Sequence, residues 1–118
     1  MMKYGYNKPY IETQNWFIKS RLRRKMDWYV YIIYCSDNSL YTGISNDVNR
    51  RIKQHAGGHG AKYFRGRKPM QLVYLESGHT RSTASQREAE IKSLSKEEKI
   101  KLIESKNNEA HGTVQSPI

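Results

Sequence analysis

Two tyrosines on either side of a short turn are the first residues in this sequence that could do chemistry together. Tyr31 and Tyr41 lie in apolar runs joined by Ser36-Asp37-Asn38, a segment typical of a three-residue hairpin loop with a left-handed asparagine. This register places both tyrosines on one sheet face as diagonal neighbours, and Gly43 leaves open space beside Tyr31. Ordinary packing against a helix fits the same pattern.

An arginine and a histidine follow on a predicted helix over residues 47–56, for which Asn46 is the expected N-cap. Arg51 and His55 are four positions apart and therefore share a helix face. A guanidinium can stabilise the charge on a transferring phosphoryl group, and an imidazole can handle a proton. A solvated helix face is the alternative interpretation.

A carboxylate lies on the inward face of a second predicted helix, which begins near residues 80–83 and ends near Leu94. Ala84 and Ile91 follow helical spacing, and Glu88 falls between them on the same face. A carboxylate that faces inward needs a partner. A metal ion and a cation such as Arg51 both satisfy that need.

The composition indicates one small basic domain that binds phosphates. The chain has 118 residues, a net charge of +10 and one cysteine, Cys35, which excludes an intrachain disulfide. Residues 50–68 combine seven Lys and Arg with four glycines and no acid, so we expect contacts to a nucleic-acid backbone. The expected contact residues are Arg50, Lys53, Lys62, Arg65, Arg67 and Lys68. A solvated basic loop is the alternative.

The remaining patterns define the organisation of the chain. Strands over 28–35, 40–44 and 70–76, with helices over 47–56, 80–94 and 95–105, give the order ββ-α-β-α-α. This predicts an α+β domain over 26–105, with a small three-stranded antiparallel sheet flanked by helices. Residues 1–25 are expected to form a basic, partly disordered extension, and 106–118 a polar tail. The sequence has no apolar run near the roughly 18 residues that cross a membrane. Together with the single cysteine, this favours a cytoplasmic protein. We expect that protein to be a monomer.

Taken together, these residues resemble the GIY-YIG nuclease domain, and most closely its small stand-alone bacterial members. The resemblance covers about residues 27–105. It rests on Tyr29-Val30-Tyr31, Tyr41-Thr42-Gly43, Arg51, His55, Glu88, Gly58-His59-Gly60-Ala61-Lys62 and Ile91-Lys92-Ser93-Leu94. Two positions depart from the family's two motifs. Tyr29 replaces the leading glycine of the first motif, and Thr42 replaces the usual isoleucine of the second.

The resemblance implies a metal-dependent endonuclease that hydrolyses phosphodiester bonds in DNA, in repair or in structure-specific cleavage. Tyr31 and Tyr41 would line the nucleophile side, and one of them, alone or with His55, would position or deprotonate the attacking water. Arg51 would stabilise phosphoryl charge. Glu88 would hold one Mg²⁺ or Mn²⁺ ion, and Gly43 would be structural. Larger family members use an additional asparagine, which residues 96–103 lack.

Other classes of function remain open alongside the enzyme. No separate DNA-binding domain is expected, so either cleavage specificity is low or a protein partner supplies it. The alternative is a catalytically inactive nuclease fold that binds DNA or RNA through its basic loop. The presence of all five candidate catalytic residues argues against such a degenerate copy. A third hypothesis, a basic RNA- or ribosome-associated protein, is supported by the net charge alone.

Overall fold

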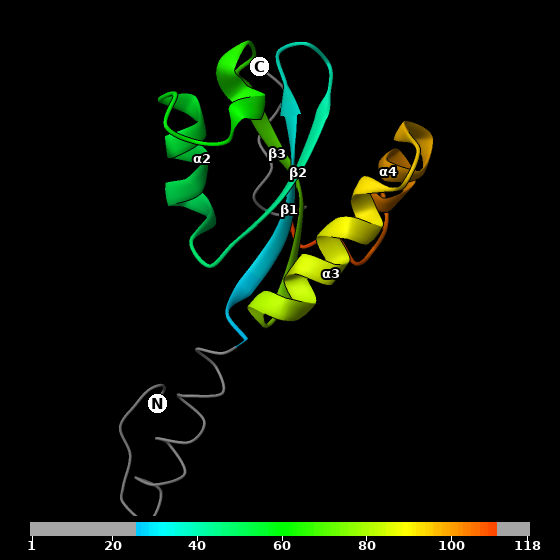
Figure 1. Ribbon diagram of the computed structural model, residues 1–118. Helices are drawn as coiled ribbons and strands as arrows, with labels where there is room; N and C mark the ends of the chain where they lie inside the picture. The colour runs from blue at the N-terminus through cyan, green and yellow to red at the C-terminus, as the bar shows by residue number, and fades with distance from the viewer. Residues whose placement is uncertain (1–25, 111–118) are drawn as a thin grey trace, which may run out of the picture.

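The fold is a three-stranded antiparallel sheet with helices on both faces (Figure 1). The structure is a computed structural model that describes residues 26–110, so the predictions for 1–25 and 111–118 lie outside the described residues. The elements in chain order are β1 (Trp28–Cys35), β2 (Leu40–Ser45), α2 (Val48–Ala56), the 3₁₀ helix η1 (Lys62–Arg65), β3 (Pro69–His79), α3 (Arg81–Lys92) and α4 (Lys96–Ile103). The predicted class and element order are confirmed. None of the helices within 26–110 is long and apolar enough to span a membrane.

Strand β1 is the centre of the sheet, which has the order β2-β1-β3. Its even-numbered residues Val30 and Ile32 pack with Ala84 and Ile91 of α3. Its odd-numbered residues face the other way, toward α2 and η1. Both faces of β1 are therefore covered, as its continuous apolar run predicts.

The β1–β2 hairpin has the register that its turn residues predict. Tyr31 pairs with Gly43 and Ile33 pairs with Tyr41, while Asn38 has a φ of 68°. The Cys35 amide donates to the Ser39 carbonyl at 2.9 Å, which closes the loop. Tyr31 and Tyr41 consequently project from the face that α2 covers, with ring centroids 6.3 Å apart.

Several predicted element boundaries were wrong by a few residues. Asp47, rather than Asn46, is the N-cap of α2, and its carboxylate accepts from the Arg50 amide at 3.2 Å. Both residue types cap helices well, so sequence alone did not separate them. The capping box at Ser95 is confirmed, but α4 ends at Ile103. Strand β3 extends to His79, past the predicted end at 76.

The C-terminal part of the described chain packs onto the edge of β3, beyond the predicted domain end at 105. Asn108 and Ala110 are buried. The Asn108 side chain accepts from the Leu75 amide at 3.1 Å and donates to the Val73 carbonyl at 2.8 Å. The Glu109 amide donates to the Leu75 carbonyl at 2.9 Å. This segment therefore satisfies backbone groups on an otherwise open sheet edge.

Candidate active site

The structure brings two tyrosines and a histidine together between the sheet and α2. Tyr31 on β1 has its hydroxyl oxygen 3.0 Å from Nε2 of His55 on α2. The ring of Tyr41, from β2, lies 5.3 Å from the His55 ring in an edge-on arrangement. Three elements that are separate in sequence thus supply one cluster, and the predicted shared face of Tyr31 and Tyr41 is confirmed.

Two aromatic residues of η1 enclose this cluster. Phe64 stacks on His55 with a centroid distance of 4.3 Å, and Tyr63 lies 5.0 Å from Tyr41. As a result Tyr31 and His55 are each only 1% exposed. From sequence, residues 57–68 are predicted to form only a basic loop, so this role was missed. The signal was the pair of adjacent aromatic residues within a segment that is otherwise polar.

Gly43 provides the space that the Tyr31 side chain occupies. A Cβ atom at Gly43 would lie 2.6 Å from the Tyr31 hydroxyl oxygen and 2.9 Å from Cε2 of Tyr41. Both distances are shorter than van der Waals contact allows. The close approach of Tyr31 to His55 therefore depends on the missing side chain at Gly43.

Burial sets the protonation state of the cluster. It lowers the pKa of His55 to about 4, and the charge of Arg51 lowers it further. Burial, with the neighbouring Tyr41, raises the pKa of Tyr31 well above its usual range, and burial also raises the pKa of Tyr41. At neutral pH the imidazole is therefore uncharged and both phenols keep their protons.

Arg51 opposes the effect of burial on the two phenols. Its guanidinium donates to the Gln54 side chain at 2.9 Å, and its positive charge lowers the pKa of both Tyr31 and Tyr41. The spacing of Arg51 and His55 on the helix predicts that they serve one site, and α2 does carry both to this face. Arg51 is the cation that can stabilise negative charge beside the phenols.

Glu88 influences the same phenols from α3. Its side chain is 21% exposed and makes an ion pair with Lys92 at 3.1 Å, one helical turn further along. Its negative charge raises the pKa of Tyr31 and of Tyr41. The ion pair with Arg51 that the inward position suggested does not form, because Lys92 is the nearer cation.

The donors available near the tyrosines fit a magnesium-type ion. Among residues 26–110 there is no group of three or more His, Cys, Asp and Glu side chains that could hold a metal. A zinc or calcium site built only from protein ligands is therefore a poor fit for this part of the chain. Mg²⁺ keeps several waters and commonly binds through one or two carboxylates, so the partly buried Glu88 carboxylate suits it.

The predicted phosphate-binding cations separate into two groups. Arg50, Lys53, Lys62, Arg65 and Lys68 are exposed, as a phosphate-binding surface requires. Arg67 instead forms an ion pair with Asp37 at 2.6 Å and lies over the Tyr63 ring at 3.9 Å. This ion pair ties η1 to the hairpin turn, and the phosphate contact expected of Arg67 stays a prediction. Arg65, Arg67 and Lys68 also line a pocket of about 510 Å³ that reaches His55.

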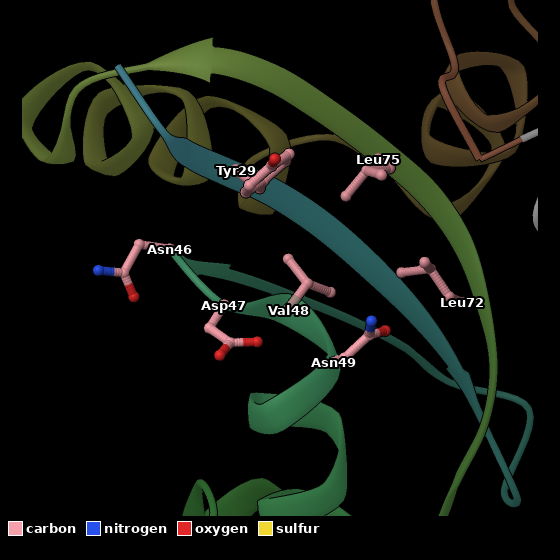
Figure 2. Close-up of a pocket in the computed structure, with 7 residues that line it drawn as sticks. All are labelled: Tyr29, Asn46, Asp47, Val48, Asn49, Leu72 and Leu75. Carbon is pink, nitrogen blue, oxygen red and sulfur yellow. The ribbon is translucent and has the colours of Figure 1, made fainter. Parts of the chain in front are cut away.

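A second groove lies beside the cluster, at the start of α2 (Figure 2). It has a volume of about 340 Å³, with Tyr29, Leu72 and Leu75 on the sheet side. Asn46, Asp47, Val48 and Asn49 form its other wall. Tyr29 has the same parity on β1 as Tyr31, so the groove continues the site along one sheet face.

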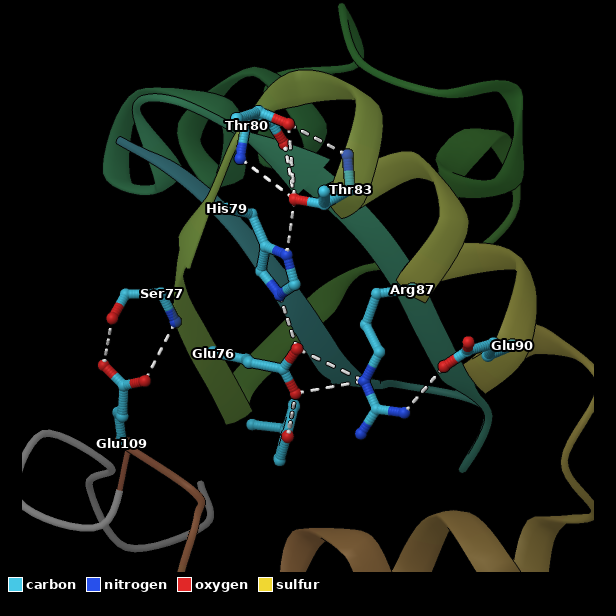
Figure 3. A network of polar contacts seen from close by, with 9 residues as sticks. Glu76, Ser77, His79, Thr80, Thr83, Arg87, Glu90 and Glu109 are labelled. Atoms are coloured by element: carbon cyan, nitrogen blue, oxygen red, sulfur yellow. Dashed lines mark hydrogen bonds and ion pairs between the residues drawn. The ribbon is translucent and has the colours of Figure 1, made fainter. Parts of the chain in front are cut away.

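A separate polar network joins β3 to α3 on the other side of the sheet (Figure 3). Glu76 accepts from the Tyr74 hydroxyl at 2.6 Å, lies 2.5 Å from His79 and forms an ion pair with Arg87 at 3.1 Å. Burial raises the pKa of Glu76, but these three hydrogen bonds more than offset it and keep that pKa below its usual value. The polar groups of this network hydrogen-bond to one another, so we assign it a structural role. It holds α3, the helix that carries Glu88, against the sheet.

These features define an α+β domain with a buried Tyr–His–Tyr cluster, an adjacent arginine and an exposed basic surface. The chain belongs to the GIY-YIG family, because the GIY-YIG catalytic domain matches residues 27–101. This is a family of nuclease domains, and its nucleases act on DNA.

Several proteins similar to this chain carry the name UPF0213. A UPF0213 protein of Haloquadratum walsbyi is 58% identical over 76 residues, which cover 64% of this chain and 85% of the relative. A UPF0213 protein of Staphylococcus saprophyticus is 52% identical over 75 residues, which cover 64% of this chain and 92% of the relative. The solution structure of a UPF0213 protein from Bacillus halodurans is 48% identical, with a TM-score of 0.44, and covers 68% of this chain and 85% of that one.

The low pKa of His55 predicts an acid-dependent loss of stability. An unfolded histidine takes up a proton near pH 6.5, whereas folded His55 does so only near pH 4. The contribution of the neutral His55 imidazole to the free energy of unfolding is therefore fully present above pH 6.5. It is lost as the pH falls toward 4. The titratable or charged side chains that face His55 are Tyr31, Tyr41 and Arg51. None of them is a carboxylate that would stabilise an imidazolium.

We expect the free energy of unfolding to fall by about 3 kcal/mol over this interval. Urea denaturation at a series of pH values measures it. The matched variant His55→Gln should show a flatter dependence over the same range. Identical pH dependence in the two proteins would contradict the assignment of this effect to His55.

Proposed function

We propose that this chain is a divalent-metal-dependent endonuclease that hydrolyses phosphodiester bonds in DNA. The observation that carries the proposal is the contact of the Tyr31 hydroxyl with His55 at 3.0 Å, in a cluster that also contains Tyr41. A buried hydroxyl and a buried imidazole cost free energy that an apolar core residue would not. Their convergence beside Arg51 is the pattern expected of a proton-transfer site.

Hydrolysis requires a water oxygen to bond to phosphorus while the bond from phosphorus to the departing sugar oxygen breaks. Tyr31, once it has released its own proton to solvent, is placed to accept the proton of the attacking water. The departing oxygen then takes a proton from solvent or from the Tyr41 hydroxyl. Arg51 stabilises the extra negative charge on the phosphoryl oxygens.

Glu88 is the residue that would hold the divalent ion. Such an ion, when bound, supplies positive charge to the phosphoryl oxygens and lowers the pKa of nearby water and phenol groups. That chemistry is what the cluster lacks on its own, because burial keeps the Tyr31 proton in place at neutral pH. The proposed ion would therefore supply the positive charge that favours loss of the Tyr31 proton.

The basic surface supports contact with the DNA backbone rather than with base edges. Its exposed members are lysines and arginines, whereas amide side chains that read bases are sparse in the segment. We propose that affinity comes from phosphates and that the shape of the substrate, or a protein partner, supplies specificity. Repair or cleavage of branched DNA is the corresponding setting.

One observation favours a second candidate, a nuclease fold that binds nucleic acid without cutting it. The Glu88 carboxylate already has a cation partner in Lys92. If that ion pair persisted in the presence of metal, the chain would bind DNA or RNA with no dependence on a divalent ion. Cleavage and binding measured on the same variants separate the two functions.

The variant Glu88→Gln tests the enzymatic proposal, because it keeps size and most hydrogen bonding but removes the charge. We expect cleavage of a panel of linear and branched DNAs in Mg²⁺ to slow by roughly 100-fold or more, with folding and DNA affinity retained. EDTA should abolish cleavage by the wild-type protein. Glu90→Gln, two residues along the same helix and 66% exposed, is the control. Wild-type rates in Glu88→Gln would rule out the role of Glu88.

A salt titration tests the basic surface. Lys62 and Arg65 are exposed and have no ion pair within residues 26–110, so each is free to contact a phosphate. The double variant Lys62→Ala/Arg65→Ala should flatten the slope of log K against log[salt] by roughly 0.9 per lost contact. The control Lys101→Ala/Lys106→Ala removes the same charge from a distant exposed region. Equal slopes for both double variants would contradict the assignment.

A further inference from the structure

The glycine-rich turn after α2 lies directly against His55. A Cβ atom at Gly60 would lie 2.0 Å from Nδ1 of His55 and 2.8 Å from its Cα. The next residue, Ala61, donates its amide to Nδ1 at 3.2 Å. The turn is held on the helix end by the His59 amide, which donates to the Gln54 carbonyl at 2.9 Å. Residue 60 therefore has to be glycine for the Ala61 amide to reach the ring.

This amide decides which ring nitrogen carries the proton. A nitrogen that accepts a hydrogen bond from a backbone amide cannot itself be protonated, and a neutral imidazole has one proton to place. With Nδ1 as the acceptor, the proton is on Nε2. Nε2 lies 3.0 Å from the Tyr31 hydroxyl oxygen, so His55 donates and Tyr31 accepts.

We infer that the Gly60–Ala61 turn is a positioning element that holds His55 as the Nε2–H tautomer and thereby makes the Tyr31 oxygen the acceptor of their hydrogen bond. This inference rests on the proposed nuclease function and assigns the proton-transfer roles within it. Both nitrogens of His55 are engaged, one by Ala61 and one by Tyr31. His55 is therefore not the group that takes the proton from water.

The Tyr31 oxygen takes that role, and His55 supports it. The Nε2–H group stabilises negative charge on the Tyr31 oxygen after its proton has left, as does the charge of Arg51. The phenolate then accepts one proton from the attacking water and returns to the phenol, so protons balance over the cycle. The hydroxyl proton of resting Tyr31 points away from His55, because the His55 side of the oxygen already accepts a hydrogen bond.

The tautomer can be measured without DNA or metal. Two-dimensional ¹H–¹⁵N NMR of the full chain at pH 7 distinguishes a protonated from an unprotonated ring nitrogen in a neutral histidine. We expect His55 to have its proton on Nε2. A proton on Nδ1 in the wild-type protein would overturn the inference, whatever the cleavage activity.

Two glycine variants test the part played by the turn. In Gly60→Ala the methyl group would collide with His55, so we expect a mixture of tautomers and a fall in kcat of roughly tenfold to 100-fold with KM little changed. Gly66→Ala is the matched control, since a Cβ atom there meets nothing within 4 Å. Wild-type tautomer and kcat in a folded Gly60→Ala protein would overturn the positioning role.

A second pair of variants keeps the inference testable if Gly60→Ala fails to fold. Glutamine at position 55 retains an N–H donor that can reach the Tyr31 oxygen, whereas leucine retains only bulk. We expect His55→Gln to keep at least tenfold more activity than His55→Leu. Equal loss in both variants would mean that a titrating imidazole is required, against the inference. An inactive wild-type chain with the expected tautomer would instead contradict the proposed function.

Discussion

The contact between the Tyr31 hydroxyl and Nε2 of His55, 3.0 Å long and buried, is the interaction on which the rest of the site depends. It joins the central strand to α2 across the sheet face. It exists because Gly43 leaves room for the phenol, because Gly60 lets the chain close over the imidazole, and because Phe64 stacks on the ring. A change in hairpin register by one residue would send Tyr31 to the opposite face and abolish the contact.

Burial sets the protonation states at this contact, and the charge of Arg51 opposes it only at the phenols. Burial strengthens the hydrogen bond by excluding water, but it also keeps the phenols protonated and the imidazole neutral. Arg51 lowers the pKa of Tyr31 and Tyr41, and Glu88 raises both. At neutral pH both phenols are thus protonated and the imidazole is neutral. Burial is the main cause of the raised phenol pKa values, and a divalent ion at Glu88 would offset the smaller contribution of the Glu88 charge.

Local chemistry made the hairpin and the helix face predictable from sequence. The turn residues determined the register through Asn38, and the spacing of Arg51 and His55 determined their shared face. Long-range contacts between polar residues were not predictable in this way. Nothing in the sequence indicates that Arg67 pairs with Asp37 across 30 positions, or that Asn108 substitutes for a neighbouring strand on β3. The aromatic cover from η1 was missed because its residues are surrounded by glycines and cations.

The central claim, that the Tyr31 oxygen is the proton acceptor in a nuclease site, is tested most directly by cleavage kinetics of Tyr31→Phe. This change removes one oxygen and keeps the ring that packs beside Gly43 and Tyr41. The account predicts that the rate in Mg²⁺ falls about 100-fold or more, as on loss of a general base, with DNA affinity unchanged. Tyr34→Phe, on the opposite face of the same strand, should cleave normally. Cleavage by Tyr31→Phe at the wild-type rate would contradict the account.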